Sequence, residues 1–205
     1  MAIFVVSGPS GVGKSTAVRA WMQREGDLRY LPTTTTRAPR REEADAHARY
    51  EFVSDEVFAR LLAAGAFAQW NHPAAGCWYG TRRRLIDDVL ADHADGVIDY
   101  CPEMFHNFRR QYPSSLVGIF IAPPSFDTLV ERLNGRGTED GEYLARKVEM
   151  ARLDMEFIDG HDYYVVNDDV ERVVDALSVI RRAEALRLRA DGRSAKPARV
   201  MWRYY

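Results

Sequence analysis

The segment from Gly8 to Ser15 constrains the fold of this chain more than any other part of the sequence. It reads Gly-Pro-Ser-Gly-Val-Gly-Lys-Ser and fits the phosphate-loop pattern G-x-x-x-x-G-K-S/T at every fixed position. An apolar, β-rich run at 2–6 precedes it, and apolar residues at helical spacing follow within 16–24. A strand, a glycine loop and a helix N-terminus direct backbone N–H groups and the positive end of the helix dipole at one point. The motif therefore predicts a site for the phosphates of a nucleoside triphosphate.

Two side chains of this motif carry distinct chemistry. The lysine of such a loop reaches the terminal phosphates, and the hydroxyl that follows it ligates Mg²⁺, so we assign these roles to Lys14 and Ser15. Asp99 ends a predicted core strand and is the candidate acid behind the water shell of the metal, with a capping or turn acid as the alternative. The predicted ATP-binding residues of the loop are Gly8, Ser10, Gly11, Val12, Gly13, Lys14, Ser15 and Thr16.

Strands and helices alternate along the chain, which predicts an α/β fold built on a doubly wound parallel sheet. The uninterrupted apolar run at 116–121 is typical of a strand buried in such a sheet. Ser125 is expected to cap a helix at 126–134, and a second helix is expected from about 139 to 157. The other core elements are predicted as strands at 95–100 and 163–166, a helix at 103–112 and a last helix from 168 to about 189.

A small mixed lobe is predicted between Thr33 and about Thr81. The run of threonines at 33–36 favours extended backbone, and short strands are expected at 50–53 and 66–70. Ser54 begins a helix that ends near Gly65, and Thr81 is expected to cap the basic helix that follows the lobe. The segment 27–32 is expected as a connection.

Composition excludes several classes of protein. Apolar residues make up 46% of the 205 residues and charged residues 28%, which excludes disorder throughout the chain. The net charge of −2 predicts no general polyanion-binding surface, so no stable nucleic-acid partner is expected. Two cysteines are too few for a disulfide framework, and no apolar stretch is long enough to cross a bilayer. We therefore expect a cytoplasmic protein without a signal peptide or membrane partner.

Six motifs, in order and at similar spacing, resemble the guanylate kinase family. The resemblance runs from about residue 2 to residue 185 and implies a P-loop kinase fold with an inserted acceptor-binding lobe and a lid. It implies a core at 1–32, 83–125 and 158–190, an acceptor-binding lobe at 33–82, a lid at 126–157 and a C-terminal tail at 191–205. The motifs are Gly8–Thr16, Thr34–Arg40, Trp78–Thr81, Pro123–Ser125, Arg132–Thr138 and Val165–Asp169.

The resemblance implies transfer of a phosphoryl group from ATP to a nucleoside monophosphate, with Mg²⁺ as cofactor and a monomer or homodimer as the working state. Such transfer needs positive charge on both anions with water excluded. Arg37 and Arg40 follow the threonine strand, and their guanidinium forks can hold a phosphate bidentately, although a solvated loop is the alternative. Tyr50 and Tyr79 match tyrosines that bind the acceptor phosphate in the family. The predicted acceptor-binding residues are Thr33, Arg37, Arg40, Tyr50, Gln69, Tyr79, Thr81 and Cys101.

The lid contributes further cations by the same resemblance. Arg132 and Arg136 are four residues apart and resemble the arginines that neutralise donor phosphates as the lid closes. Lys147 stands where the family has another lid arginine, and Arg146 beside it is a possible substitute. Asn167 matches a position near the donor adenine, with a helix N-cap as its alternative role. The predicted catalytic residues are Lys14, Arg37, Arg132, Arg136, Arg146 and Lys147.

The chain departs from the family where the base is read. The family has a Glu and an Asp that read the guanine edge, and this chain has Gln69 and Cys101 there. A carboxylate accepts from both N–H groups of guanine N1 and N2, whereas a carboxamide accepts from one and presents a donor to the other. Losing a charge-assisted bond costs about 1.5–3 kcal/mol. Gln69 can instead pair with N6 and N1 of adenine as acceptor and donor.

Three functions are compatible with these sequence features. The first is a kinase of guanylate kinase type acting on GMP or dGMP. The second is the same enzyme acting on a non-guanine or modified nucleotide, or on a sugar phosphate as in the related ribose 1,5-bisphosphate kinases. The third is a phosphopeptide-binding module like the guanylate-kinase-like domains of scaffold proteins, which the intact Lys14 and Ser15 disfavour because such domains have typically lost a working phosphate loop.

Overall fold

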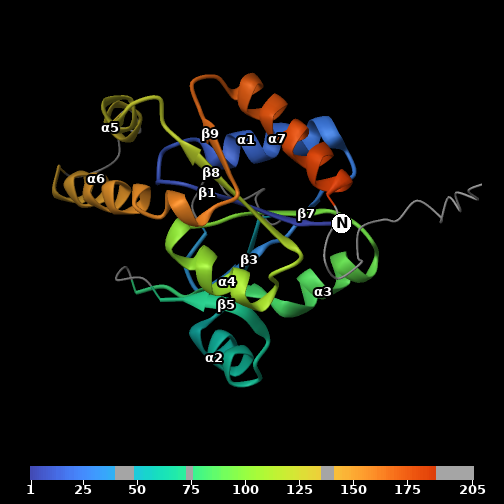
Figure 1. Ribbon diagram of the computed structural model, residues 1–205. Coiled ribbons are helices and arrows are strands. Elements are labelled where there is room, and N and C mark those ends of the chain that lie inside the picture. Colours follow the sequence, from blue (N-terminus) through green and yellow to red (C-terminus); the bar gives the residue numbers. More distant parts are fainter. Residues whose placement is uncertain (40–48, 73–75, 135–140, 188–205) are drawn as a thin grey trace, which may run out of the picture.

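A five-stranded parallel sheet forms the centre of the molecule in the computed structural model (Figure 1). The structure describes residues 1–39, 49–72, 76–134 and 141–187, with side chains described from residue 145 onward in the last range. The strand order is β2-β7-β1-β8-β9, and all four pairings are parallel. The predicted parallel sheet is confirmed. Its strands are β1 (Ile3–Ser7), β2 (Arg29–Tyr30), β7 (Gly96–Asp99), β8 (Leu116–Ala122) and β9 (Tyr163–Val166).

Helices cover both faces of this sheet because alternate side chains of each strand point to opposite faces. Phe4 and Val6 of β1 pack with α1 (Lys14–Glu25) and α7 (Val170–Leu186) on one face. Ile3 and Val5 pack on the other face with α3 (Arg83–Ala91) and α4 (Phe105–Gln111). The fully buried Trp21 of α1 meets Phe4 edge to face, with ring centroids 5.4 Å apart. The sheet is therefore doubly wound, as predicted.

The C-terminal half follows its predicted elements with small shifts. Ser125 caps α5 (Phe126–Asn134), since its Oγ accepts from Thr128 N at 3.1 Å. The helix expected at 103–112 is a short 3-10 turn, η3 (Pro102–Met104), followed by α4. Asp169 caps α7 by accepting from Arg172 N at 3.1 Å. The remaining elements are α6 (Gly141–Met155) and the 3-10 turn η4 (Ile158–Gly160).

A second, four-stranded sheet lies beside the first and has the order β4-β3-β6-β5. Its strands are β3 (Thr33–Thr35), β4 (Tyr50–Phe52), β5 (Phe67–Asn71) and β6 (Tyr79–Arg82). Helix α2 (Asp55–Ala63) covers one face, where Phe58 stacks on Phe67 with ring centroids 4.4 Å apart. In Figure 1, α2 lies below β5, on the side away from α4. This small sheet occupies part of the range predicted for the acceptor-binding lobe; the bounds of lobe and lid stay predictions.

Two sequence predictions are wrong in this region. Thr81 does not cap the basic helix: it lies in β6, and the residue before α3 is Arg82. The reason is that Thr81 is paired on both sides, with Thr33 of β3 and with Gln69 of β5, so its backbone belongs to the ladder. The connection at 27–32 contains the two-residue strand β2, which is too short to produce a periodic pattern.

Candidate active site

The phosphate loop joins β1 to α1 through glycines that no other residue could replace without strain. Gly8 has φ 140°, and a Cβ there would lie 2.1 Å from the carbonyl oxygen of Ile121. Gly13 precedes α1 with φ 96°, and a Cβ there would lie 2.5 Å from Asn167 Nδ2. Positive φ is inexpensive only for glycine. The loop therefore has the backbone that brings the first N–H groups of α1 to one point, where they have no partners within the helix.

Lys14 folds over this loop. Its Nζ donates to the carbonyl oxygens of Gly8 at 2.6 Å and Pro9 at 2.9 Å. Asp154, near the end of α6, also lies beside the phosphate loop. Burial raises the pKa of its carboxyl to about 6. Glu103 adds to this rise, whereas Lys14 and the Ser10 backbone oppose it. An acid of the predicted lid thus stands beside the lysine of the loop.

Asn167 holds the loop from the opposite side. It is 4% exposed and its Nδ2 donates to Val12 O at 2.6 Å. Asp169, rather than Asn167, caps α7, so the alternative cap role of Asn167 is excluded. Arg132 of α5 donates from Nη2 to Asn167 O at 3.1 Å. The residues predicted from two distant motifs therefore meet at the phosphate loop.

The two predicted metal residues lie in contact. Ser15 Oγ donates to Asp99 Oδ2 at 2.8 Å. Arg49 donates from Nη2 to Ser15 Oγ at 2.8 Å and also to Asp99 Oδ2, and Tyr30 donates to the other carboxylate oxygen. Burial alone would raise the pKa of Asp99, but the charge of Arg49 and the hydrogen bonds outweigh it and lower that pKa. Asp99 is therefore held as a carboxylate.

The donor set at Ser15 and Asp99 fits Mg²⁺. A hydroxyl and a carboxylate are the hard oxygen ligands that Mg²⁺ prefers, and this ion usually takes one or two carboxylates with waters and substrate phosphates. Within the described ranges, no group of three or more His, Cys, Asp or Glu could hold a metal.

Strand register places five predicted acceptor residues on one face of the small sheet. Thr33 is paired with Tyr50 and with Thr81, and Thr81 is paired with Gln69. Paired residues point to the same face, as do residues two apart along a strand. This face also contacts the segment that follows β7, since Asn71 Nδ2 donates to Cys101 Sγ at 3.8 Å. We call it the inner face and define it by Thr33, Tyr50, Gln69, Asn71, Tyr79 and Thr81.

Arg37 lies beside the inner face. Its Cζ is 5.1 Å from the ring centroid of Tyr50 and 5.6 Å from that of Phe52, and its Nη1 donates to Ala38 O at 2.9 Å. Arg146 and Lys147 lie on α6, about two turns before Asp154. Arg40, Arg136 and the tail 191–205 fall outside the described residues. The predicted roles of all these residues stay predictions.

The two residues predicted at the base-reading positions, Gln69 and Cys101, are neutral. Gln69 is 4% exposed and its Nε2 donates to Thr81 Oγ1 at 3.1 Å. Within the described part of the chain, the buried oxygens Gln69 Oε1 and Asn71 Oδ1 have no hydrogen-bond partner. Burial raises the pKa of the Cys101 thiol to about 11, so it is uncharged near neutrality. Two amide oxygens, rather than two carboxylates, are left to accept hydrogen bonds here.

Sequence reasoning missed four residues of the site. Asn71 was within reach, because it follows Gln69 by two and strand alternation places both on one face. Tyr30, Arg49 and Asp154 carry no local signal, since each meets the site only through residues far along the chain.

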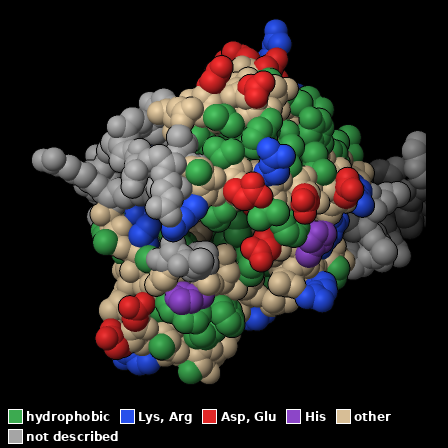
Figure 2. Space-filling view, turned by 90° about the vertical axis from the view of Figure 1, so that its left-hand side faces the viewer, with side chains coloured by type: hydrophobic (Ala, Val, Ile, Leu, Met, Phe, Trp, Pro, Cys, Tyr) green, Lys and Arg blue, Asp and Glu red, His purple; other side chains and the backbone are tan. Residues whose placement is uncertain are grey.

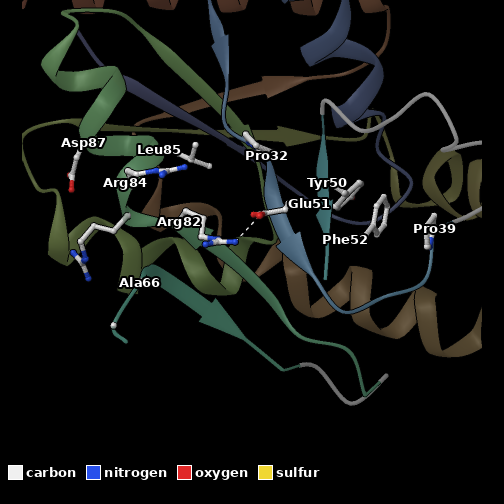
Figure 3. A pocket seen from close by; sticks show the side chains of 12 residues that line it. Pro32, Pro39, Tyr50, Glu51, Phe52, Ala66, Arg82, Arg84, Leu85 and Asp87 are labelled. Atoms are coloured by element: carbon white, nitrogen blue, oxygen red, sulfur yellow. Dashed lines mark hydrogen bonds and ion pairs between the residues drawn. The ribbon is translucent and has the colours of Figure 1, made fainter. Parts of the chain in front are cut away.

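The described surface has a hollow that lies apart from the phosphate loop. Among the coloured side chains of Figure 2, both basic and acidic groups are present on the face shown. A hollow of about 890 Å³ lies along β4 and the start of α3. Figure 3 draws its lining side chains, among them Arg82 and Glu51, whose Nη2 and Oε1 are 2.6 Å apart. Its lining includes Tyr50 but none of the residues 8–16 of the phosphate loop. This hollow is therefore not the site formed by the phosphate loop.

Comparison with known proteins agrees with this geometry. A family model described as guanylate kinase matches residues 1–184. The chain belongs to the guanylate kinase family. As a member it is a phosphotransferase of the nucleoside monophosphate kinase type, and the resemblance drawn from the six motifs is confirmed.

Individual guanylate kinases match over most of their length. The chain is 37% identical over 190 residues to guanylate kinase of Symbiobacterium thermophilum, covering 93% of this chain and 89% of that one. It is 34% identical over 187 residues to guanylate kinase of Sphingopyxis alaskensis, covering 91% and 84%. The crystal structure of guanylate kinase from Anaplasma phagocytophilum superposes with a TM-score of 0.75 at 26% identity, covering 91% and 87%. No helix in the described ranges has both the length and the apolar character needed to span a membrane.

Proposed function

We propose that this chain transfers the γ-phosphate of ATP to a nucleoside or deoxynucleoside monophosphate, with GMP or dGMP as the preferred acceptor. The observation that supports the proposal is a contact between two regions predicted to bind phosphate: the phosphate loop with Lys14, and the small sheet beside Arg37 and Tyr50. The side chain of Arg49, which adjoins the inner face, contacts Ser15 of the loop at 2.8 Å. Two bound phosphates would therefore lie close together.

The residues of the chain act by positioning and by neutralising charge. Lys14 and the N-terminal N–H groups of α1 bind the donor phosphates, and Ser15 and Asp99 are the residues that would hold Mg²⁺. The ion would supply further positive charge beside the donor phosphates. Arg37, Arg40, Tyr50 and Tyr79 hold the acceptor phosphate, while Arg132, Arg136, Arg146 and Lys147 neutralise the donor as the lid excludes water.

The inner face offers two acceptors to a base. One N–H of Gln69 Nε2 donates to Thr81, whereas Gln69 Oε1 and Asn71 Oδ1 are unpartnered among the described residues. Guanine presents the donors N1–H and N2–H, one for each of these oxygens. Adenine presents a single donor, N6–H, on this edge and would leave one buried oxygen without a hydrogen bond. The neutral pair replaces a charge-assisted bond, so guanine recognition is weaker than a carboxylate would make it.

A second candidate keeps the reaction and changes the acceptor to a modified nucleotide or a sugar phosphate. It is favoured by the neutral Cys101 and by the absence of a carboxylate at Gln69. A coupled assay of ADP release distinguishes the candidates, with GMP, dGMP, AMP, CMP, UMP and ribose 1,5-bisphosphate as acceptors. Turnover highest with GMP or dGMP supports the proposal, and turnover confined to the sugar phosphate supports the second candidate.

The same assay with Lys14→Met separates this enzyme from a contaminating kinase. If no acceptor is turned over, calorimetric titration with Mg²⁺ and ATP decides what remains. Failure to bind ATP would favour the phosphopeptide-binding module and contradict both kinase candidates.

A further inference from the structure

Arg49 joins the small sheet to the metal site. Its backbone belongs to the sheet, because its carbonyl oxygen accepts from Thr33 N at 3.0 Å immediately before β4 begins. Its side chain leaves the sheet and reaches Ser15, at the start of α1, and Asp99, at the end of β7. The arginine therefore spans the junction between the inner face and the phosphate loop.

The guanidinium occupies the place where a cation bound by Ser15 and Asp99 would lie. The Arg49 side chain is 21% exposed and that of Asp99 9%, so this ion pair is largely shielded from water. Tyr30 closes the site from another side: its hydroxyl donates to Asp99, and its ring centroid is 5.6 Å from the Cζ of Arg49. Ser15, Tyr30 and Arg49 thus all stabilise Asp99 as a carboxylate, and Arg49 supplies the positive charge paired with it.

Arg49 and a divalent ion cannot use these oxygens together. A serine hydroxyl has one proton and two lone pairs. Ser15 donates its proton to Asp99 and accepts a hydrogen bond from Arg49. To ligate a metal at the position of the guanidinium, Ser15 would need the lone pair that now accepts from Arg49. A guanidinium and Mg²⁺ on the same carboxylate oxygen would also repel each other at contact distance.

We propose that Arg49 is a built-in cation that takes the place of the divalent metal when nucleotide is absent and is displaced when metal and nucleotide bind. Arg49 is then a positioning residue: it holds Ser15 and Asp99 in their ligating geometry and ties the small sheet to the core until the metal arrives. This inference rests on the Mg²⁺ site of the proposed function. Its consequence is that the bonds of the Arg49 side chain to Ser15 and Asp99 and the binding of metal exclude each other.

Metal affinity without nucleotide tests this directly. The probe is Mn²⁺, which shares the oxygen-ligand preference of Mg²⁺ and is followed by its electron paramagnetic resonance signal as it is titrated into the full chain. Replacing Arg49 by Met keeps the length of the stem and leaves Asp99 without its cation. We expect Arg49→Met to bind Mn²⁺ at least about tenfold more tightly than the parent chain, a change of roughly 1.4 kcal/mol.

Two further variants make the result specific. Arg24→Met changes the net charge equally but removes an arginine paired with Glu171 and Asp175, away from Asp99, and should leave Mn²⁺ affinity unchanged. Adding Asp99→Asn to Arg49→Met should abolish the gain. Equal Mn²⁺ affinity in Arg49→Met and the parent chain, or an equal gain in Arg24→Met, overturns the proposal.

Separate controls distinguish a folding defect of the variant and a failure of the proposed function from a failure of this inference. If Arg49→Met does not melt cooperatively, Arg49→Lys replaces it, because lysine keeps the charge but lacks the guanidinium fork. The Arg49→Lys variant should bind Mn²⁺ more tightly than the parent chain. Unchanged Mn²⁺ affinity in this variant overturns the proposal. The titration needs no turnover, so a failure of the proposed function would appear as an inactive parent chain in which the Mn²⁺ difference persists. A failure of this inference would appear as an active parent chain in which the difference is missing.

Discussion

The Nζ of Lys14 donates to carbonyl oxygens of its own loop, and a bound polyphosphate has to replace those bonds. Replacing Lys14 by Met removes the charge while keeping most of the stem. Because charge-assisted hydrogen bonds contribute about 1.5–3 kcal/mol, we expect ATP affinity to fall by roughly 10- to 100-fold. Calorimetric titration with ATP and Mg²⁺ measures the change, with Arg24→Met as the control of equal charge. Unchanged affinity in Lys14→Met would contradict the assignment of Lys14 to the phosphates.

The second prediction at the scale of residues concerns the base. Gln69→Glu with Cys101→Asp restores the carboxylates that the family has at these positions. We expect kcat/KM for GMP to rise about tenfold or more, since a carboxylate accepts both guanine N–H groups and forms stronger bonds. The measurement is ADP release with GMP and, for comparison, AMP. A rise for both acceptors would indicate a change in folding or lobe position, and no rise would show that the neutral pocket does not limit guanine recognition.

At the scale of elements, the end of α6 places an acid against the phosphate loop. The pKa of Asp154 is raised to about 6 from an ordinary value of 3.8, mainly by burial. The folded state therefore keeps a proton that the unfolded state loses between those two values. Stability falls as pH rises from about 4 to about 6, and the penalty is complete above pH 6.

Asp154→Asn should remove that penalty. Because one pKa unit corresponds to roughly 1.4 kcal/mol and solvent screens part of the effect, we expect a gain of about 1–2 kcal/mol at pH 8. The gain should shrink toward pH 4.5. Urea unfolding between these pH values measures it, with the exposed Asp159→Asn as control. A gain that is the same at pH 4.5 and pH 8 would contradict titration of Asp154 as its cause.

At the scale of the whole molecule, Arg181 joins elements from both ends of the chain. It lies on α7, is 14% exposed, and pairs with Glu25 at 2.7 Å, Asp27 at 2.8 Å and Asp95 at 2.9 Å. Its loss would leave partly buried carboxylates without their cation. We expect Arg181→Met to lower the free energy of unfolding by about 2–4 kcal/mol while ATP affinity stays unchanged. Arg84→Met removes only an exposed i,i+4 pair and should cost less than about 1 kcal/mol. A large loss of ATP affinity in folded Arg181→Met would show that this network reaches the site.

Features that depend only on a few neighbouring residues were predictable from the sequence. The phosphate loop, the buried strand at 116–121 and the caps Ser54 and Ser125 each follow from short-range chemistry, because a motif, an apolar run or a capping hydroxyl acts within one turn or strand. The small strands β2 and β6 were not predictable in this way. Their two and four residues depend on neighbours supplied by other segments, and the pairing of Thr81 with Thr33 and Gln69 overrides its preference for a cap.

The sequence by itself determined the family, the phosphate loop and the parallel sheet, since these rest on spacing along the chain. Only the tertiary structure decided which polar groups meet: Arg49 with Ser15 and Asp99, Asp154 with Lys14, and Asn71 with Cys101. The physical reason is that hydrogen bonds and ion pairs act over a few ångströms in space, whatever the separation along the chain. Strand register and helix packing choose their partners, and in this protein they bring a guanidinium of the small sheet to the metal ligands of the core.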